Sequence, residues 1–345
     1  MANLRANSIV GVGSTDAGVV FDGVTKVKTQ NYFYLPTGNT ESRGRGRGVF
    51  GGGYAPSNLN SQDIQYVNIT SSGNAIDFGE LTTLDKTRGT SSCSSSTRGV
   101  WGGGYGATPL TGNTNIINYV TIASTGNALD FGELFIQKER RSSLANSTRG
   151  IFGGGSTDPT GPSNTVNNID YLTIASTGNA LDFGDLTVQR GRLCATSSST
   201  RGLFSLGTTD STANTNTIDY ITIASSGNAV DFGDMSYATS WPTALSSSIR
   251  GVFAGGAPGV NTIEYVTIAS TGNSQDFGDA TQGLFGSMGT SNGIKGLIAG
   301  NIISLEENRI EYITIATTGN GQDFGDLVKG ISAGGACSDS HGGLG

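Results

Sequence analysis

The sequence predicts an all-β protein, a six-bladed β-propeller of four-stranded antiparallel blades. One phrase, Tyr171-Leu-Thr-Ile-Ala-Ser-Thr-Gly-Asn-Ala-Leu-Asp-Phe-Gly-Asp185, recurs six times, and its phenylalanines are 45 to 53 residues apart, a period typical of propeller blades. The 55 glycines suit turns between many short strands. Apolar residues come in alternating, β-branched runs, the pattern of half-buried strands. The repeated tyrosines are Tyr66, Tyr119, Tyr171, Tyr220, Tyr265 and Tyr312, and the phenylalanines are Phe78, Phe131, Phe183, Phe232, Phe277 and Phe324.

Each unit divides into four strands, as the fourth unit illustrates. Residues 186–199 are expected to form the first strand, 203–207 the second, 217–224 the third and 229–234 the fourth. In the third strand Tyr220 and Thr222 should face one way and Ile221 the other, because successive side chains of a strand alternate. The Gly-Asn pair that follows each third strand is predicted to form a tight hairpin turn, since glycine adopts positive φ easily.

The two ends of the chain predict how the ring closes. Residues 1–42 do not match the repeat and are expected to be an attachment extension, whereas residues 43–345 form the propeller. The last residues align with a first strand, and the first unit lacks one. We therefore expect residues 331–340 to complete the first blade, which removes exposed strand edges.

The second strand carries an aromatic residue followed by glycines, as in Phe50-Gly-Gly-Gly and Trp101-Gly-Gly-Gly. An arginine precedes this second strand, a tyrosine-containing strand follows it, and the fourth strand carries a further aromatic residue. In this order the unit resembles the repeats of kelch propellers, and the resemblance covers residues 43–345. Phe183 and its equivalents stand where kelch repeats usually have tryptophan. The fourth and sixth units lack the double glycine, which predicts different packing there.

Composition excludes several classes of function. The net charge of −7 and the pI of about 4.7 argue against a nucleic-acid partner, which would need clustered basic residues. The sequence contains neither a membrane span nor a secretory signal. The odd number of widely spaced cysteines, Cys93, Cys194 and Cys337, indicates small buried residues rather than disulfides, and synthesis in a reducing cytoplasm.

A basic and an acidic residue recur once per unit, and we expect each such pair to form a structural contact that fixes turn geometry. The basic residues are Arg47, Arg98, Arg149, Arg201, Arg250 and Lys295, and the acids are Asp77, Asp130, Asp182, Asp231, Asp276 and Asp323. A second acid closes each phrase, as Glu80 does in the first unit. These outer acids predict a solvated rim or, alternatively, a cation site or a surface for a basic partner.

The sequence predicts no cofactor, no metal site and no catalytic activity. His341 is the one histidine of the chain, so neither a multi-histidine metal site nor a histidine-based triad can be assembled. Asp-Phe-Gly occurs without the other kinase motifs. The units are also so alike that no single locus is expected to concentrate acids and arginines.

The units differ most in the loop between the second and third strands. Variable loops on a rigid scaffold commonly carry recognition. Tyr54 and Tyr105 could stack on a sugar, although ordinary solvated loops are the simpler interpretation. The candidate recognition residues are Tyr54, Asn58, Tyr105, Asn113, Asp158, Asn164, Asp210 and Asn214.

The wording of the repeat, Tyr-Val-Thr-Ile-Ala-Ser-Thr-Gly-Asn-Ala-x-Asp-Phe-Gly-Asp-Leu, resembles repeats in structural and tail proteins of marine bacteriophages, including cyanophages. The resemblance implies a virion protein made in the host cytoplasm, expected in the tail or its fibres in multiple copies per particle. Residues 1–42 would contact other virion proteins, and the loops a host-surface glycan or a further virion protein. The alternatives are a capsid or baseplate decoration propeller and, third, a propeller glycosidase or lyase.

Overall fold

The computed structural model describes residues 46–55, 59–82, 87–106, 112–158, 164–210, 213–303 and 307–344, which all belong to the compact unit Glu41–Gly345. The predicted extension over residues 1–42 and the candidate residue Asn58 lie outside the described residues. The described chain is almost entirely β-structure. None of its helices is long and apolar enough to cross a membrane.

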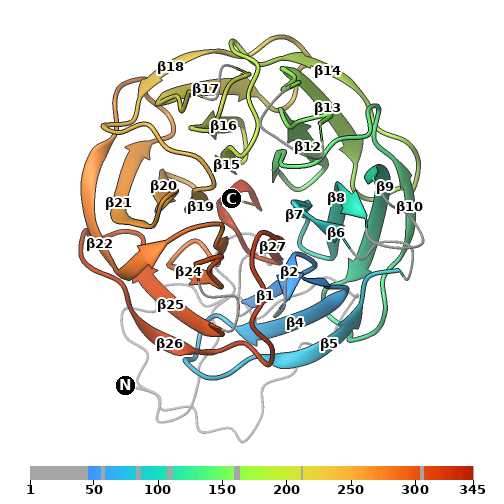
Figure 1. The fold of residues 1–345 in the computed structure, drawn as a ribbon, viewed down its shortest axis with the longest axis vertical. Coiled ribbons are helices and arrows are strands. Elements are labelled where there is room, and N and C mark those ends of the chain that lie inside the picture. The colour runs from blue at the N-terminus through green and yellow to red at the C-terminus, as the bar shows by residue number, and fades with distance from the viewer. Residues whose placement is uncertain are drawn as a thin grey trace, which may run out of the picture. The chain divides into compact units, whose positions relative to one another are not determined.

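Apart from one small two-stranded sheet, the described strands form six antiparallel sheets around a central axis, so the predicted all-β, six-bladed propeller of four-stranded blades is confirmed (Figure 1). From the axis outward, the first blade consists of β27 (Gly335–Ser338), β1 (Arg47–Gly51), β4 (Asp63–Asn68) and β5 (Ile76–Glu80). The second blade consists of β7 (Ser91–Ser94), β8 (Arg98–Gly106), β9 (Gly112–Thr121) and β10 (Leu129–Glu133). The third blade consists of β11 (Ser142–Ala145), β12 (Arg149–Gly153), β13 (Asn168–Thr173) and β14 (Leu181–Asp185).

The fourth blade consists of β15 (Cys194–Ser197), β16 (Arg201–Ser205), β17 (Thr217–Thr222) and β18 (Val230–Asp234). The fifth blade consists of β19 (Thr243–Ser246), β20 (Arg250–Ala254), β21 (Val260–Thr267) and β22 (Gln275–Leu284). The sixth blade consists of β23 (Met288–Ser291), β24 (Lys295–Ala299), β25 (Arg309–Thr314) and β26 (Gln322–Asp326). Three short elements complete the described structure: β2 (Tyr54–Ala55), β3 (Leu59–Asn60) and β6 (Thr87–Arg88). The chain ends in a 3-10 turn, η3 (Gly342–Leu344). The predicted first strand over 186–199 is shorter in the structure, because β15 occupies only its last part and the residues before it cross between blades.

The C-terminal strand closes the ring as predicted. β27 pairs antiparallel with β1, with Gly48 opposite Ser338 and Gly51 opposite Gly335. The first blade therefore combines both ends of the described chain.

The hydrophobic core lies between blades. Ile221 and Ile223 are buried, whereas Thr222 is exposed, which confirms the alternation predicted for the third strand. One core cluster joins Phe232 of the fourth blade to Phe253 of the fifth, and the other clusters likewise combine residues of adjacent blades. The three cysteines are free and buried in the innermost strands, as predicted.

The Gly-Asn pairs do not form hairpin turns, which corrects the sequence-based prediction. The turn is made just before them, where the Ser71 amide donates to the Asn68 carbonyl oxygen. The Gly-Asn segment then runs along the outer strand of the preceding blade. Gly126 N donates to Phe78 O (2.8 Å), Ala128 N donates to Glu80 O (2.8 Å), and the Asn127 Oδ1 accepts from Glu80 N (3.2 Å). All six blade junctions repeat this set of bonds, which we call the outer clamp.

The expected Arg–Asp contacts are also corrected. Arg149 lies over the ring of Tyr171 in its own blade (4.7 Å from Cζ to the centroid) and donates from Nη1 to the Ile223 carbonyl of the next blade (3.0 Å). The other four repeated arginines make the same two contacts. Among the described residues, ion pairs involve other side chains. The repeated aspartates are exposed on the outer strands, where solvent satisfies them.

The fourth and sixth blades keep the backbone of the others despite their altered glycine motif. Leu206 has φ 63° and Gly300 has φ 73°, close to the 65° of Gly154 at the equivalent position. The different packing that the sequence predicted in these blades is therefore not seen in the backbone.

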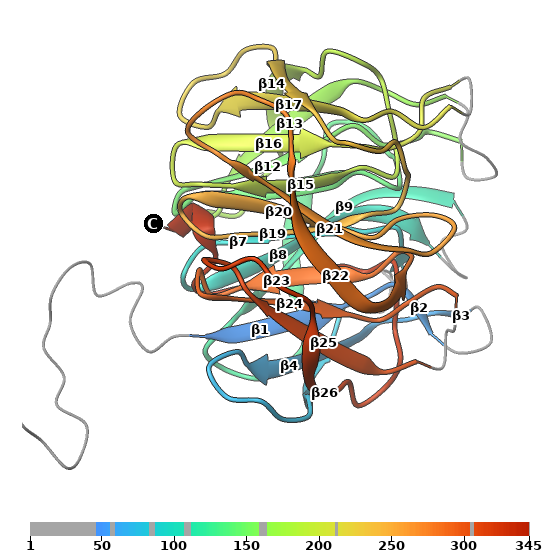
Figure 2. The same cartoon turned by 90° about the vertical axis from the view of Figure 1, so that its left-hand side faces the viewer.

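The innermost strands surround a central channel that the C-terminus closes at one end. The turn η3 lies against β11, β15 and β19, at the end of the propeller opposite β2 and β3 (Figures 1 and 2). His341 fixes this plug. Its Nδ1 accepts a hydrogen bond from Gly343 N (3.1 Å), so its Nε2 must donate to Ser94 O (2.8 Å). Burial lowers the pKa of His341, and the neutral ring is the form that makes both bonds.

Deleting residues 331–345 should abolish folding, because β1 would lose its partner and the ring its closure. Circular dichroism and thermal unfolding would show no cooperative transition. Deleting only 341–345 is the control, since it leaves β27 paired and should preserve a cooperative transition at reduced temperature. Unchanged melting of the longer deletion would contradict ring closure by β27.

Arg149→Ala should lower the free energy of unfolding by about 1–2 kcal/mol, because a charge-assisted hydrogen bond and a cation–π contact are lost at a half-buried site. Lys295 occupies the equivalent place over Tyr312 (4.7 Å), but among the described residues it makes no bond to the next blade. Lys295→Arg should therefore stabilise the protein by roughly 0.5–1 kcal/mol. Urea unfolding of both variants measures these changes, and a destabilising Lys295→Arg would contradict the role given to the arginines.

The stability of the protein should fall as the pH drops below about 6.5, the ordinary histidine value, because the unfolded chain gains a proton there that native His341 resists. His341→Gln should remove this contribution, at most about 1.4 kcal/mol per pH unit. Urea unfolding at pH 7.5 and 5.5 compares the two proteins. Equal pH dependence in both would show that His341 does not stay neutral in the fold.

Candidate functional site

The open end of the central channel is surrounded by six equivalent residues, one from each connection between blades. Each donates its backbone N–H to the carbonyl oxygen of the equivalent residue in the preceding blade, at 2.7 to 3.0 Å, so that six hydrogen bonds form a closed circle. We call these residues the mouth ring. They are Gly89, Arg140, Arg192, Trp241, Gly286 and Ala333.

Every residue of the mouth ring has a left-handed backbone conformation, with φ between 51° and 65°. Glycine adopts this conformation freely, but other residues pay roughly 1–2 kcal/mol for it. Glycine occupies only two of the six positions. Arg140, Arg192 and Trp241 are adjacent in the ring and carry the large side chains, whereas the opposite half consists of Gly89, Gly286 and Ala333. Among the six ring residues themselves, large polar and aromatic side chains therefore occur on one side only, although the backbone of the ring is six-fold.

A cluster of charges lies beside the first of these large residues. Arg140 Nη2 is 2.9 Å from Glu139 Oε1, and Arg88 Nε is 3.8 Å from Glu139 Oε2. Glu139 is buried, and burial raises its pKa against the opposing effect of Arg140 and Arg88. One carboxylate thus serves two guanidinium groups.

Arg192 lies next in the ring and belongs to no ion pair among the residues described. Its Cζ is 5.7 Å from the ring of Trp241, which in turn meets Phe285 edge to face at 6.5 Å. Burial lowers the pKa of Arg192, and the neighbouring Arg140 acts in the same direction, although the group remains a cation. Its Nε is buried without a hydrogen-bond partner within the described part of the chain.

Two predicted recognition residues come together near this cluster. The Arg88 guanidinium lies 5.2 Å from the ring of Tyr54 and 4.3 Å from that of Tyr105. Burial raises the pKa of Tyr54, and Arg88 partly offsets this, so its hydroxyl remains a neutral donor. Tyr54 and Tyr105 therefore join the arginine cluster, as the sequence could not have shown.

The other described candidates mainly hold the loops in place. Asp210 accepts from Thr165 N (2.5 Å) and Thr165 Oγ1 (2.6 Å) in the neighbouring loop, and Asn113 Nδ2 donates to Thr157 O (2.9 Å). Asn214 accepts from Thr208 Oγ1 (3.1 Å). Asp158 N donates to Ser156 Oγ (3.1 Å), and Asn164 has φ 54°. These residues connect segments of loop backbone to one another. Asp158 also lies near the charge cluster, where its carboxylate raises the pKa of Glu139.

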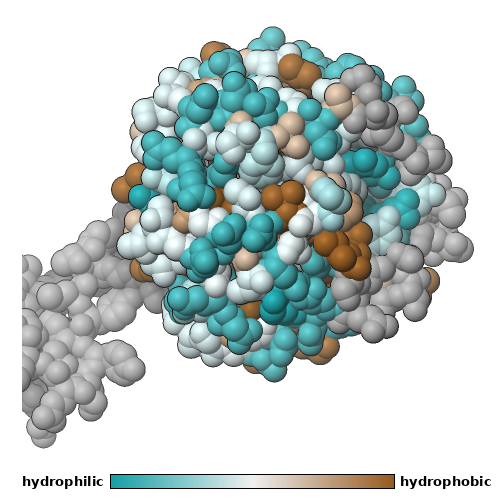
Figure 3. Space-filling model, turned by 60° about the vertical axis from the view of Figure 1, so that its left-hand side comes forward, coloured by the Kyte–Doolittle hydropathy of each residue, from teal (hydrophilic) through white to brown (hydrophobic). Residues whose placement is uncertain are grey.

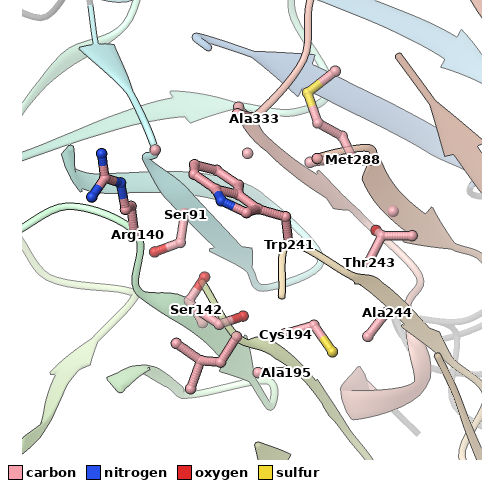
Figure 4. A pocket seen from close by; sticks show the side chains of 18 of the residues that line it. Ser91, Arg140, Ser142, Cys194, Ala195, Trp241, Thr243, Ala244, Met288 and Ala333 are labelled. Carbon is pink, nitrogen blue, oxygen red and sulfur yellow. The ribbon is translucent and has the colours of Figure 1, made fainter. Parts of the chain in front are cut away.

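Below the mouth ring the channel forms a cavity of about 130 Å³, lined by the residues that precede and begin the six innermost strands. Figure 4 shows Trp241 and Arg140 at its edge, with Ser91 and Ser142 among the side chains that line it. Four lining hydroxyls, those of Ser91, Ser92, Ser143 and Ser287, are buried without a hydrogen-bond partner among the described residues. Buried polar groups normally find partners, so these hydroxyls are suited to bind a polar group that enters the channel.

Buried polar residues under the mouth hold the connections in place. They directly precede the repeated tyrosines: Gln65, Asn118, Asp170, Asp219, Glu264 and Glu311. Asp219 pairs with the fully buried Arg190 (3.0 Å) and accepts from Thr187 Oγ1 (2.5 Å) in the preceding connection. Sequence analysis missed this set, although a polar residue before every repeated tyrosine was a visible signal.

The expectation that no locus concentrates acids and arginines is corrected by the cluster of Arg88, Glu139, Arg140 and Arg192. The residues before each innermost strand differ among units, which is the available signal in the sequence, but the pattern places them within the first strand. In the described structure no group of three or more His, Cys, Asp or Glu side chains is arranged to hold a metal ion. On the face shown in Figure 3, hydrophobic residues occur singly or in small groups among hydrophilic ones.

Comparison with protein-family models and with curated proteins finds no match for this chain.

Proposed function

We propose that this protein is a non-enzymatic structural component of a virus particle, in the tail or its fibres, and that its mouth ring and adjoining tyrosines bind a glycan of the host surface. The observation that carries the binding role is the asymmetry of the mouth ring. Arg140, Arg192 and Trp241 occupy a strained backbone position where glycine would cost less. Strained non-glycine residues cluster at functional sites because their side chains are needed there.

The chemistry of the mouth suits a carbohydrate. Sugars present apolar faces and hydroxyl groups, and the mouth offers the rings of Trp241 and Tyr105 together with guanidinium donors and the unpartnered serine hydroxyls below. Concave sites that combine aromatic walls with a few convergent polar groups are typical of small-ligand binding.

The virion assignment rests on the wording of the repeat, which resembles that of marine phage structural and tail proteins. In this proposal residues 1–42 contact other virion proteins and the propeller is present in multiple copies per particle. Mass spectrometry of purified particles tests this part. Absence of the chain from particles would contradict it, and its stoichiometry and position would separate a tail component from a capsid or baseplate decoration.

Trp241→Gly should abolish glycan binding while preserving the fold, because glycine adopts φ near +59° without strain. Binding of the full chain to a glycan array measures the first effect and thermal unfolding the second. Ala333→Gly is the matched control, since it makes the same backbone change at an equivalent ring position and should keep binding. Full binding by Trp241→Gly would refute the mouth as the site, and release of reducing sugars from bound glycan would favour a glycosidase or lyase.

A further inference from the structure

We infer, building on the proposed glycan role, that the mouth selects acidic sugars, with one sugar carboxylate bound by Arg192 and the sugar ring placed against Trp241. This inference concerns the class of ligand, which the binding role alone leaves open. It rests on the charges of the mouth, on the arrangement of Arg192 and Trp241, and on the hydroxyls beneath them.

The mouth is electropositive on an acidic protein. The chain has a net charge of −7, yet the guanidinium groups of Arg88, Arg140 and Arg192 all act on Glu139. The carboxylate of Asp158 also acts on Glu139, so that among these described groups three positive charges face two negative ones. An excess of guanidinium groups at a partly buried site attracts an anion, because the lower local dielectric strengthens the interaction.

The three arginines are not equivalent. Arg88 and Arg140 form direct ion pairs with Glu139 (3.8 and 2.9 Å), whereas Arg192 interacts with that carboxylate only at longer range and forms no direct ion pair among the described residues. Its buried Nε also lacks a hydrogen-bond partner there. One guanidinium with unused donors matches a ligand with one negative charge, and a planar carboxylate can accept two parallel hydrogen bonds from it. A single carboxylate therefore fits better than a doubly charged phosphate.

The neighbouring groups match the rest of an acidic sugar. The Arg192 guanidinium lies over the ring of Trp241 (5.7 Å from Cζ to the centroid), and the remaining aromatic surface of Trp241 is offered to the apolar face of a pyranose ring. Ser143 and Ser287, in the cavity below the ring, have buried hydroxyls without partners among the residues described, and can exchange hydrogen bonds with sugar hydroxyls. Arginine, tryptophan and serines thus converge from different connections on one opening.

Isothermal titration calorimetry of the full chain tests the inference. The carboxylated probes are sialyllactose and oligogalacturonate, and their neutral counterparts are lactose and oligogalactose. A heparin hexasaccharide serves as a sulfated probe. At least one carboxylated probe should bind ten- to hundredfold more tightly than its neutral counterpart, the range expected of a charge-assisted hydrogen bond. Raising the salt from 50 to 300 mM should weaken that binding by several-fold.

Arg192→Gln should bind the carboxylated probe and its neutral counterpart with equal affinity, because glutamine keeps a hydrogen-bond donor but lacks the positive charge. Arg192→Gly should give the same result without a fall in melting temperature, because it also relieves the left-handed backbone. Arg309→Gln, which removes one positive charge from a different part of the propeller, is the control and should keep the preference.

Three other results of these titrations would each contradict a particular part of the proposal. Equal binding of acidic and neutral sugars, unaffected by Arg192→Gln, overturns the inference but leaves the glycan role intact. Tighter binding of the sulfated probe than of either carboxylate overturns the choice of carboxylate. Binding of no sugar in these titrations and on the array overturns both the inference and the glycan role.

Discussion

The outer clamp is the interaction on which the rest of this propeller depends. At each junction the Gly-Asn segment of one blade adds its backbone to the outer strand of the blade before it, through two amide-to-carbonyl bonds and an asparagine side chain. Glycine is required in the partner strand too, because a Cβ on Gly79 would lie 2.5 Å from the carbonyl oxygen of Gly126. The clamp thus covers the exposed outer edge of every blade and ties it to the next.

Three further sets of contacts also connect each blade to the next one around the ring. Each repeated arginine reaches the next blade's carbonyl oxygen, the apolar clusters combine adjacent blades, and the mouth ring joins all six connections in one circle. Because these contacts repeat around the ring, with the arginine bond present in five blades, they leave little freedom for variation in the scaffold. The residue type varies between blades mainly where the contacts use only backbone atoms. The mouth ring is such a place, because its backbone hydrogen bonds form equally with glycine, arginine or tryptophan.

Because the ring is held by backbone bonds while its side chains are free to differ, a uniform repeat can carry an asymmetric site. The backbone of the mouth ring is almost six-fold, with φ confined to a narrow range, while three adjacent side chains differ from the rest. The far end of the channel is occupied by η3 and the neutral His341, whereas the mouth is open to a ligand. The buried acids and amides before the repeated tyrosines hold the connections rigidly, which keeps Arg192 and Trp241 in fixed positions.

The sequence by itself determined the six units, the four-strand order, the alternation of the third strand, the buried cysteines and the closing of the first blade by the C-terminal strand. These follow from periodicity and alignment within the chain. Only the tertiary structure decided the partners of Arg149 and of the Gly-Asn segments, because both contact backbone atoms of the next blade, and a backbone acceptor leaves no mark in a sequence. It alone also revealed the mouth ring, since residues such as Gly89 and Ala333, far apart in the chain, become neighbours only when the ring closes.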